Sequence, residues 1–218
     1  TGGDITIYNG NIVATGGSQG AGIGGGGNVT VEITIYQGDI TANGGKNGAG
    51  IGSGQNNEGG KITAGCITIY DAKINATAGE KGAGIGGGDG GQAGQITIHG
   101  GEITASTKNK GTGIGSGSGG TTGDVTINGG KITATGGSGG SGIGGGYRGH
   151  CSTITINDGD ITATGGDNGS GIGGVMESPG GNGTVIINGG TVNATGQYNA
   201  AGIGGSETES ITDMWDYT

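Results

Sequence analysis

Three tyrosines and a histidine have the spacing that most clearly suggests binding chemistry. Tyr8, Tyr36 and Tyr70 each follow an Ile-Thr-Ile triplet in successive copies of a repeat, and His99 takes the same place in the fourth copy. An aromatic side chain offers an apolar face and a polar tip, which suits a sugar ring and its hydroxyl groups. Like side chains one repeat apart can also stack and serve stability alone. The row is therefore either a carbohydrate platform or a structural ladder.

Two segments depart from the repeat and form a second group of candidates. Tyr147-Arg148-Gly149-His150-Cys151 contains the only Arg of the chain, and Val175-Met176-Glu177-Ser178-Pro179 contains the only Pro. A repeat protein usually binds its ligand through the loops along one of its sides. Carbohydrate contacts are therefore also expected at Tyr147, Arg148, His150 and Glu177. The alternative is that both segments are ordinary solvated loops.

Catalytic and metal chemistry have little support. No serine sits in a strand-turn-helix nucleophile elbow, and His-x-x-His and clustered Cys motifs are lacking. A polysaccharide lyase or glycosidase would need two carboxylates about 5–9 Å apart. The acids of the variable loops fall in different repeats: Glu58, Asp89, Asp124 and Glu177. The segment 119–124 also departs from the Gly-Gly-x-Gly-x-Asp calcium repeat, so no catalytic residue, metal site or cofactor is expected.

Seven copies of one unit must position these residues. The apolar triplets begin at Ile5, Ile33, Ile67, Ile96, Val125, Ile154 and Val185. Gly supplies 66 of 218 residues, which argues against helical repeats because Gly costs about 1 kcal/mol against Ala in a helix. The prediction is an all-β, three-faced parallel β-helix of about seven coils of 28–34 residues. It is expected to be right-handed, as parallel crossovers usually are. Residues 1–205 are expected to form the solenoid, and residues 206–218 either a cap, in which Ile211 and Trp215 cover the last coil, or a linker.

Alternation within each copy predicts the core. Strand side chains alternate between two faces, so Ile132 and Ala134 should point inward while Thr133 and Thr135 point outward. One inward column is predicted to contain Ile12, Ile40, Ile74, Ile103, Ile132, Ile161 and Val192, and another Ile23, Ile51, Ile85, Ile114, Ile143, Ile172 and Ile203. On the outside, a charged row of alternating sign should form ion pairs between coils: Asn11, Asp39, Lys73, Glu102, Lys131, Asp160 and Thr191.

Composition excludes several partners. The net charge is −9, which disfavours contact with a phosphate backbone, so no nucleic-acid partner is expected. No run of 18 apolar residues exists, so no membrane span is expected.

Cys66 and Cys151 lie three coils apart, too far for a disulfide, and are predicted to be free thiols. The chain does not begin with Met and its first residues resemble the tail of a coil, which suggests a piece of a longer protein. Its uncapped first coil would allow self-association.

The outward Thr residues suggest a further alternative. Thr133 and Thr135 lie beside Thr162 and Thr164 in the predicted sheet, and this array resembles the Thr-x-Thr face of β-solenoid ice-binding proteins. Other coils depart from the pattern by carrying Asn43, Asn75 and Asn193. Thr is also a common strand residue on a solvated face.

Units such as GDITANGGKNGAGIGSG and GKITATGGSGGSGIGGG resemble the Gly-rich repeats of secreted and surface proteins of Gram-positive bacteria. The resemblance covers Ile5–Gly205 and implies an extracellular or cell-surface, adhesin-like or carbohydrate-binding protein. The resulting hypothesis is a non-catalytic extracellular module, a stalk or adhesion domain that binds a polysaccharide or glycan. A polysaccharide-active enzyme, a glycoside hydrolase or lyase, and an ice-binding protein are the alternatives.

Overall fold

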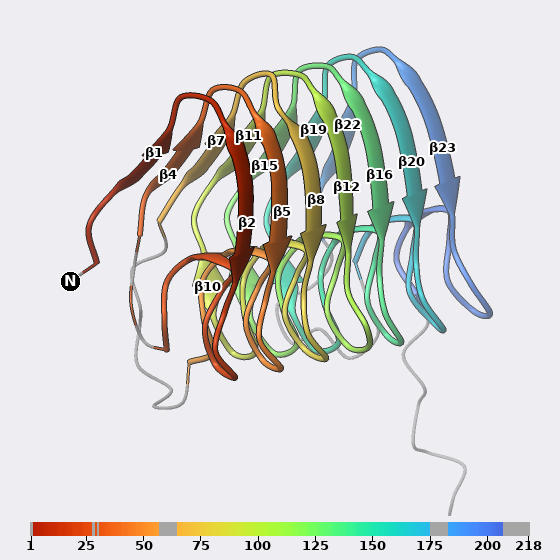
Figure 1. Cartoon of the computed structure of the whole chain (residues 1–218). Coiled ribbons are helices and arrows are strands. Elements are labelled where there is room, and N and C mark those ends of the chain that lie inside the picture. Colours follow the sequence, from red (N-terminus) through yellow and green to blue (C-terminus); the bar gives the residue numbers. More distant parts are fainter. Residues whose placement is uncertain (1, 28, 30, 57–64, 175–182, 207–218) are drawn as a thin grey trace, which may run out of the picture.

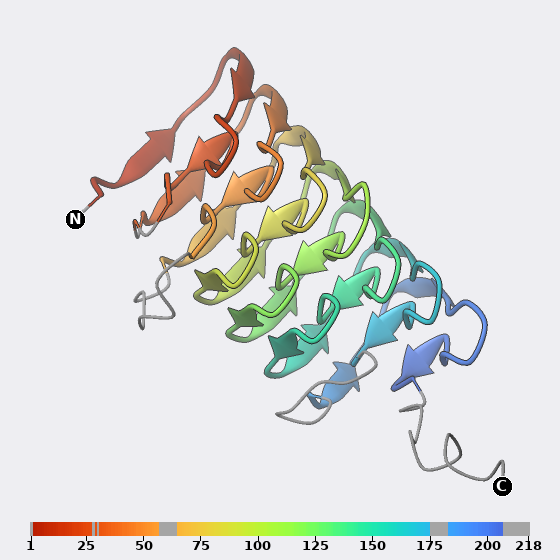
Figure 2. The ribbon, with the colours of Figure 1, turned by 90° about the horizontal axis from the view of Figure 1, so that it is seen from below.

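Each repeat folds into three short strands, and equivalent strands of successive repeats pair in parallel (Figure 1). The computed structural model describes residues 2–27, 29, 31–56, 65–174 and 183–206. Within these residues every regular element is a strand. The sheets follow one another around the solenoid, and Figure 2 shows the coils succeeding one another along its length. The prediction of an all-β parallel β-helix is confirmed.

The three main sheets each contain seven strands. The first comprises β1 (Ile5–Ile7), β4 (Ile33–Ile35), β7 (Ile67–Ile69), β11 (Ile96–Ile98), β15 (Val125–Ile127), β19 (Ile154–Ile156) and β22 (Val185–Ile187). The second comprises β2 (Asn11–Thr15), β5 (Asp39–Asn43), β8 (Lys73–Thr77), β12 (Glu102–Ser106), β16 (Lys131–Thr135), β20 (Asp160–Thr164) and β23 (Thr191–Thr195). The third comprises β3 (Ile23–Gly24), β6 (Ile51–Gly52), β9 (Ile85–Gly86), β13 (Ile114–Gly115), β17 (Ile143–Gly144), β21 (Ile172–Gly173) and β24 (Ile203–Gly204).

A small fourth sheet lies in segments that were expected to be loops. It consists of β10 (Gln92–Ala93), β14 (Thr121–Thr122) and β18 (His150–Cys151). Thr122 pairs with both Ala93 and Cys151, and all three side chains are buried. Part of the solenoid therefore has a fourth side, and His150 belongs to a strand rather than to a free loop.

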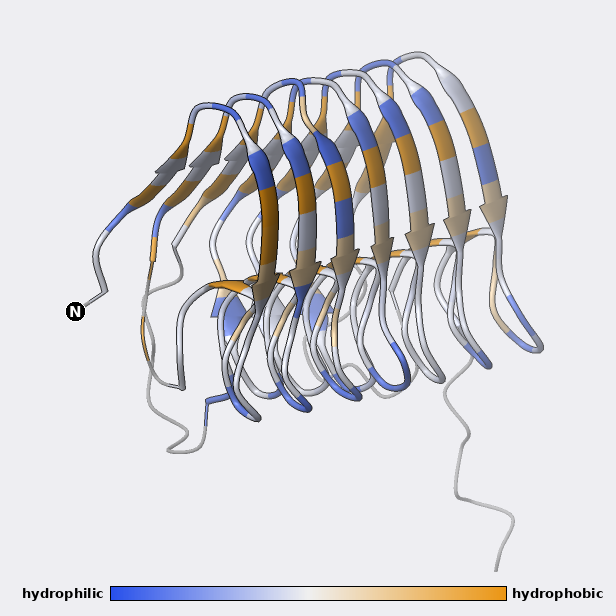
Figure 3. Ribbon diagram, in the orientation of Figure 1, coloured by the Kyte–Doolittle hydropathy of each residue, from blue (hydrophilic) through white to orange (hydrophobic). Residues whose placement is uncertain are grey.

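The predicted core columns are confirmed. Ile132 lies beside Ile103 and Ile161 in the second sheet, and Ile143 lies beside Ile114 and Ile172 in the third. All of these are at most 1% exposed. Figure 3 shows the alternation along the second sheet as polar and apolar bands that continue from strand to strand.

The terminal coils are less buried because, among the described residues, each has a neighbouring coil on one side only. Ile12 in the first coil is half-buried, and Ile203 in the last is 48% exposed. Ser206 bridges back to Ala200. The predicted cap residues Ile211 and Trp215 lie outside the described residues.

Candidate functional site

The four predicted ring residues form one continuous stack. The ring centroids of Tyr8 and Tyr36 are 5.3 Å apart, those of Tyr36 and Tyr70 are 4.8 Å apart, and those of Tyr70 and His99 are 4.8 Å apart. Adjacent rings lie within 10° of parallel. We call these four residues the ring ladder. Because each inner ring is covered on both faces by its neighbours, the ladder presents ring edges and hydroxyl groups to solvent.

Asparagines continue the same row. Nδ2 of Asn128 lies 3.3 Å from Nδ1 of His99, Asn157 donates to the side-chain oxygen of Asn128 at 2.7 Å, and Asn188 donates to Asn157 at 2.7 Å. The chain of amide hydrogen bonds follows the register of the first sheet. The row thus has the stacked and hydrogen-bonded geometry of a structural ladder, whereas carbohydrate contact on the ring ladder stays a prediction.

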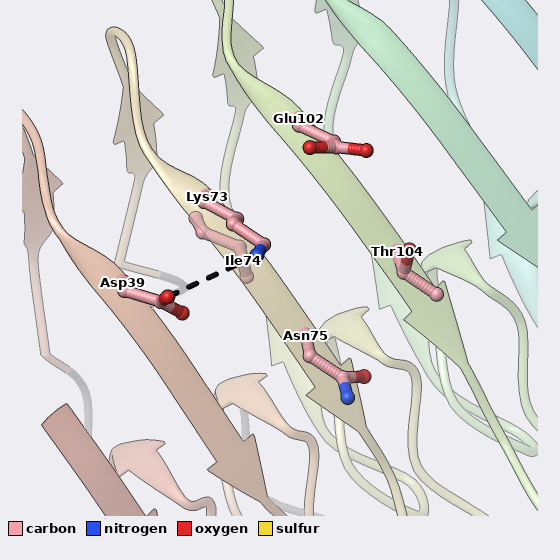
Figure 4. A pocket seen from close by; sticks show the side chains of 6 residues that line it. All are labelled: Asp39, Lys73, Ile74, Asn75, Glu102 and Thr104. Carbon is pink, nitrogen blue, oxygen red and sulfur yellow. Dashed lines mark ion pairs between the residues drawn. The ribbon is translucent and has the colours of Figure 1, made fainter. Parts of the chain in front are cut away.

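The charged row lies on the outer face of the second sheet. Nζ of Lys73 is 3.9 Å from Oδ2 of Asp39, and Nζ of Lys131 is 4.0 Å from Oε1 of Glu102. Asp39, Lys73 and Glu102 lie on three neighbouring strands (Figure 4). They line a hollow that measures about 190 Å³. The charges alternate as expected, and Asp39 and Glu102 each have a lysine partner in the row, so this hollow offers a ligand little unsatisfied charge.

A second hollow lies where two sets of turns meet. The turn 136–142 joins β16 to β17, and its counterparts in the neighbouring coils are 107–113 and 165–171. Tyr147 follows β17 and donates its backbone N–H to the carbonyl of Lys110 at 2.9 Å, while its own carbonyl accepts from Gly119 at 2.8 Å. Both bonds hold Tyr147 against turns of the preceding coil.

We call this hollow the turn notch. It measures about 240 Å³, and its lining residues are Lys110, Ser138, Gly139, Tyr147, Asp167 and Asn168. Lys110 belongs to the preceding coil and Asp167 to the following one, so they lie two coils apart, about 9.6 Å along the axis. Ser138 and Gly139 belong to the coil between these two and form the floor of the notch. The notch exists because that coil carries small residues.

Two cations lie beside the aromatic ring of the notch. Nζ of Lys110 is 4.8 Å from the ring centroid of Tyr147, and the guanidinium carbon of Arg148 is 5.2 Å from it. A cation within about 6 Å of an aromatic face is attracted by the ring. Arg148 also has a φ of 55°, an uncommon backbone conformation for a side-chain-bearing residue. The notch therefore combines a cationic wall, an aromatic wall and an opposite wall of carboxylate and amide.

The structure thus brings together only some of the predicted loop residues. Tyr147 lines the notch, and Arg148 lies beside the ring of Tyr147 without lining the notch. His150 lies in β18 beside Thr121, half-buried, and does not line the notch. Glu177 lies outside the described residues. The ring ladder follows the first sheet, whereas the notch lies among the turns that precede and follow the third.

Of the four acids considered for catalysis, Glu58 and Glu177 lie outside the described residues, and Asp89 and Asp124 have structural partners. Oδ2 of Asp89 lies 3.0 Å from Nζ of Lys81 and accepts from Gln55 at 3.3 Å. Oδ1 of Asp124 accepts the backbone N–H of Thr153 at 3.0 Å. This hydrogen bond, followed by that of the Ser152 hydroxyl, lowers the pKa of Asp124.

The two cysteines are free, as predicted. Burial, and to a lesser extent the charge of Asp124, raises the pKa of the Cys151 thiol to about 12.

The sequence of six repeats matches a family model described as Beta helix repeat. The matched residues are 5–27, 33–55, 67–89, 125–147, 154–174 and 185–207. The chain belongs to the beta helix repeat family. The matched segments do not cover the repeat that begins at Ile96. In the turn of that repeat, Thr107 replaces a Gly or Ala of the other turns, and Lys108 replaces a Gly that is Gln197 in the last repeat of this beta-helix repeat protein. No curated protein and no solved structure matches the chain significantly.

Sequence reasoning missed most of the notch. Lys110, Ser138, Gly139, Asp167 and Asn168 lie in turns of constant length, which drew no attention because length variation falls elsewhere. Aligning these turns across the repeats would have shown Gly139 between Lys110 and Asn168. In the described part of the beta-helix repeat protein, no three His, Cys, Asp or Glu residues group as a metal site, and no helix is long and apolar enough to cross a membrane.

Proposed function

We propose that this beta-helix repeat protein is a non-catalytic carbohydrate-binding module, and that the turn notch is its primary glycan contact. The observation that carries the proposal is the arrangement of Lys110, Tyr147, Asp167 and Asn168 around one hollow. Carboxylate, amide and ammonium groups supply the acceptors and donors that sugar hydroxyls need. Tyr147 adds an apolar wall.

The size of the notch suits one sugar unit. Pockets that enclose drug-sized ligands measure about 300–1,000 Å³, and the notch measures about 240 Å³. Two coils of about 4.8 Å each separate its walls. A monosaccharide at the end or edge of a glycan fits this description better than a long bound polysaccharide.

The ring ladder is a secondary candidate within the same function. Its rings lie face to face at 4.8–5.3 Å, so a sugar can reach the edges of Tyr36 and Tyr70 but not their faces. Tyr8 is 73% exposed and has one uncovered ring face. Stacking of the usual kind is therefore available at one end of the ladder only.

Binding is favoured over hydrolysis because a single carboxylate lines the notch. Glycosidases use a pair of carboxyl groups about 5–9.5 Å apart. Asp167 is the one carboxylate among the residues that line the notch. The polysaccharide-active alternative would be supported if the protein released reducing ends or unsaturated products from a glycan that it binds.

An ice-binding function is a second candidate, favoured by the register of the second sheet. Thr133 and Thr135 lie directly beside Thr162 and Thr164. Val13, which is 74% exposed, and several Asn residues interrupt the array. Thermal hysteresis measured on the purified protein tests this candidate, and its absence would remove it.

The proposed setting is the cell surface or the extracellular space, where the solenoid serves as a stalk or adhesion domain. Its support is the resemblance to Gly-rich surface repeats together with a uniform stacked architecture. Detection of the chain by antibody on intact cells, with a cytoplasmic protein as the negative control, tests the location.

A glycan array tests the binding function. We expect the 218-residue protein to bind a subset of glycans, and Tyr147→Ser, which introduces the residue found one coil earlier at Ser118, to weaken this binding about tenfold or more. Tyr36→Ala serves as the comparison and should leave binding unchanged. Binding that survives Tyr147→Ser but is lost in Tyr36→Ala would move the site to the ring ladder, and the absence of any bound glycan would overturn the function.

A further inference from the structure

Most lysines of this chain have a carboxylate partner. Of the six lysines that the structure describes, four lie within 4.0 Å of an acid: Lys46 near Glu80 at 3.7 Å, Lys73 near Asp39 at 3.9 Å, Lys81 near Asp89 at 3.0 Å and Lys131 near Glu102 at 4.0 Å. Among the described residues, Lys108 and Lys110 have no such partner. Lys110 lies over the ring of Tyr147 instead and lines the notch.

The preceding coil shows what an acid at this position would do. Lys81 and Lys110 occupy equivalent turn positions, each four residues before the Ile that begins the third strand of its coil. The acid that pairs with Lys81 is Asp89, eight residues further along. The residue eight positions after Lys110 is Ser118, which carries no charge. The fourth coil therefore keeps the lysine of this ion pair but lacks its carboxylate.

Resting on the carbohydrate-binding function proposed above, we propose that the turn notch selects a sugar that carries a carboxylate. The carboxylate of a hexuronic acid binds the ammonium group of Lys110, as Asp89 binds Lys81 in the preceding coil. The hydroxyl groups at the other end of the sugar bind the side chains of Asp167 and Asn168 on the opposite wall. The ring of Tyr147 attracts the ammonium group of Lys110 and so keeps it over the notch.

The charge of the whole chain narrows the ligand further. A net charge of −9 repels densely charged polyanions at long range, and Asp167 repels a second anionic group inside the notch. An isolated acidic sugar fits these constraints, whereas a heavily sulfated polysaccharide or a nucleic acid does not.

Calorimetric titration with methyl glucuronide and with methyl glucoside tests the selectivity, because the two ligands differ only in the carboxylate. We expect the glucuronide to bind about fivefold tighter at low ionic strength, as one partly exposed ion pair allows. This preference should shrink as salt is added.

Three variants locate the effect. Ser118→Asp gives Lys110 an internal partner equivalent to the one that Asp89 gives Lys81, and it should abolish the preference for the glucuronide while the protein stays folded. Lys110→Gln should do the same. Lys108→Gln removes the same charge from the same turn outside the notch, and it should leave the preference intact.

The outcomes separate this inference from the function on which it rests. Equal affinity of the original protein for both ligands would overturn the selectivity and leave the carbohydrate-binding function standing. An equal loss of preference in Lys108→Gln and Lys110→Gln would also overturn it, because the effect would then be long-range charge. If neither sugar binds and the glycan array is blank, the proposed function itself fails.

Discussion

Gly139 leaves the space that the ring of Tyr147 occupies. A Cβ placed on Gly139 would lie 2.7 Å from Cδ2 of Tyr147 and 3.3 Å from its Cβ. The φ of Gly139 is 71°, and Asn168, at the same position one coil later, has a φ of 55°. Asn tolerates this left-handed conformation better than most residues. Gly139 is thus a glycine whose lack of a side chain creates the turn notch, at a position where the fold also accepts Asn.

This relationship predicts that Gly139→Asn closes the notch without unfolding the protein. The new side chain should fill the floor and displace the ring of Tyr147, so that glycan binding falls about tenfold or more while the melting temperature changes by only a few degrees. Binding on the glycan array and circular dichroism check the two parts. Unchanged glycan affinity in a folded Gly139→Asn protein would exclude the notch as the site.

A different glycine position should tolerate no side chain. Gly144 has a φ of 139°, and a Cβ there would collide with the carbonyl group of Gly173 in the next coil. Gly144→Ala should therefore destabilise the solenoid by about 3 kcal/mol or more, since backbone strain and a steric clash add. Gly17→Ala is the matched control, because a Cβ on Gly17 meets nothing within 4 Å, and it should change stability by less than about 1 kcal/mol. Urea denaturation measures both.

The ring ladder should contribute to stability according to the number of ring contacts. Tyr36 stacks on Tyr8 and on Tyr70, whereas Tyr8 stacks on Tyr36 alone. Each contact is worth about 0.5–1.5 kcal/mol, so Tyr36→Ala should cost roughly twice as much as Tyr8→Ala in urea denaturation. Tyr198→Ala, at a side chain 80% exposed, is the control and should cost little. Equal losses in Tyr8→Ala and Tyr36→Ala would show that stacking is not the source of the stability.

The core could be predicted from sequence because its signal is repeated seven times. Alternation placed Ile132 inward and Thr133 outward, and the constant spacing between strands carried the same assignment to every coil. The small fourth sheet was missed because its strands are two residues long and lack an apolar pattern. Its one signal was the equal length of three successive repeats, which brings Ala93, Thr122 and Cys151 into register.

The candidate site could be predicted only in part, because it depends on contacts between coils. Tyr147 and Arg148 were identified because they break the repeat. Lys110 was not, since its proximity to Tyr147 arises from a backbone hydrogen bond between turns 37 residues apart in sequence. Gly139 contributes to the notch by having no side chain. A search of the sequence for reactive residue types does not detect such a contribution.

The two free cysteines should differ sharply in reactivity. Burial raises the pKa of Cys151 to about 12, so at pH 8 only about one thiol in 10⁴ is ionised, and the thiolate is the nucleophile. Cys66 is only partly buried. Iodoacetamide followed by peptide mass spectrometry should therefore modify Cys66 and leave Cys151 intact, and both should react in denaturant. Labelling of Cys151 in the native protein at a rate close to that of Cys66 would contradict its burial in β18.

Asp124 should make the stability of the solenoid sensitive to acid. The backbone N–H of Thr153, followed by the Ser152 hydroxyl, stabilises the carboxylate and lowers its pKa below the ordinary value of 3.8. Because the unfolded chain then binds the proton more tightly than the folded one, this contribution is present above about pH 4 and is lost as the pH falls through the lowered pKa. Asp124→Asn keeps an acceptor oxygen for Thr153 but removes the charge, so it should be less stable than the original protein at pH 7. The two unfolding curves should converge as the pH falls below 4, whereas Asp167→Asn controls for the loss of one negative charge from the chain. A stability difference for Asp124→Asn that is the same at pH 7 and pH 3 would mean that the charge of Asp124 does not contribute to the contact with Thr153 in the next coil.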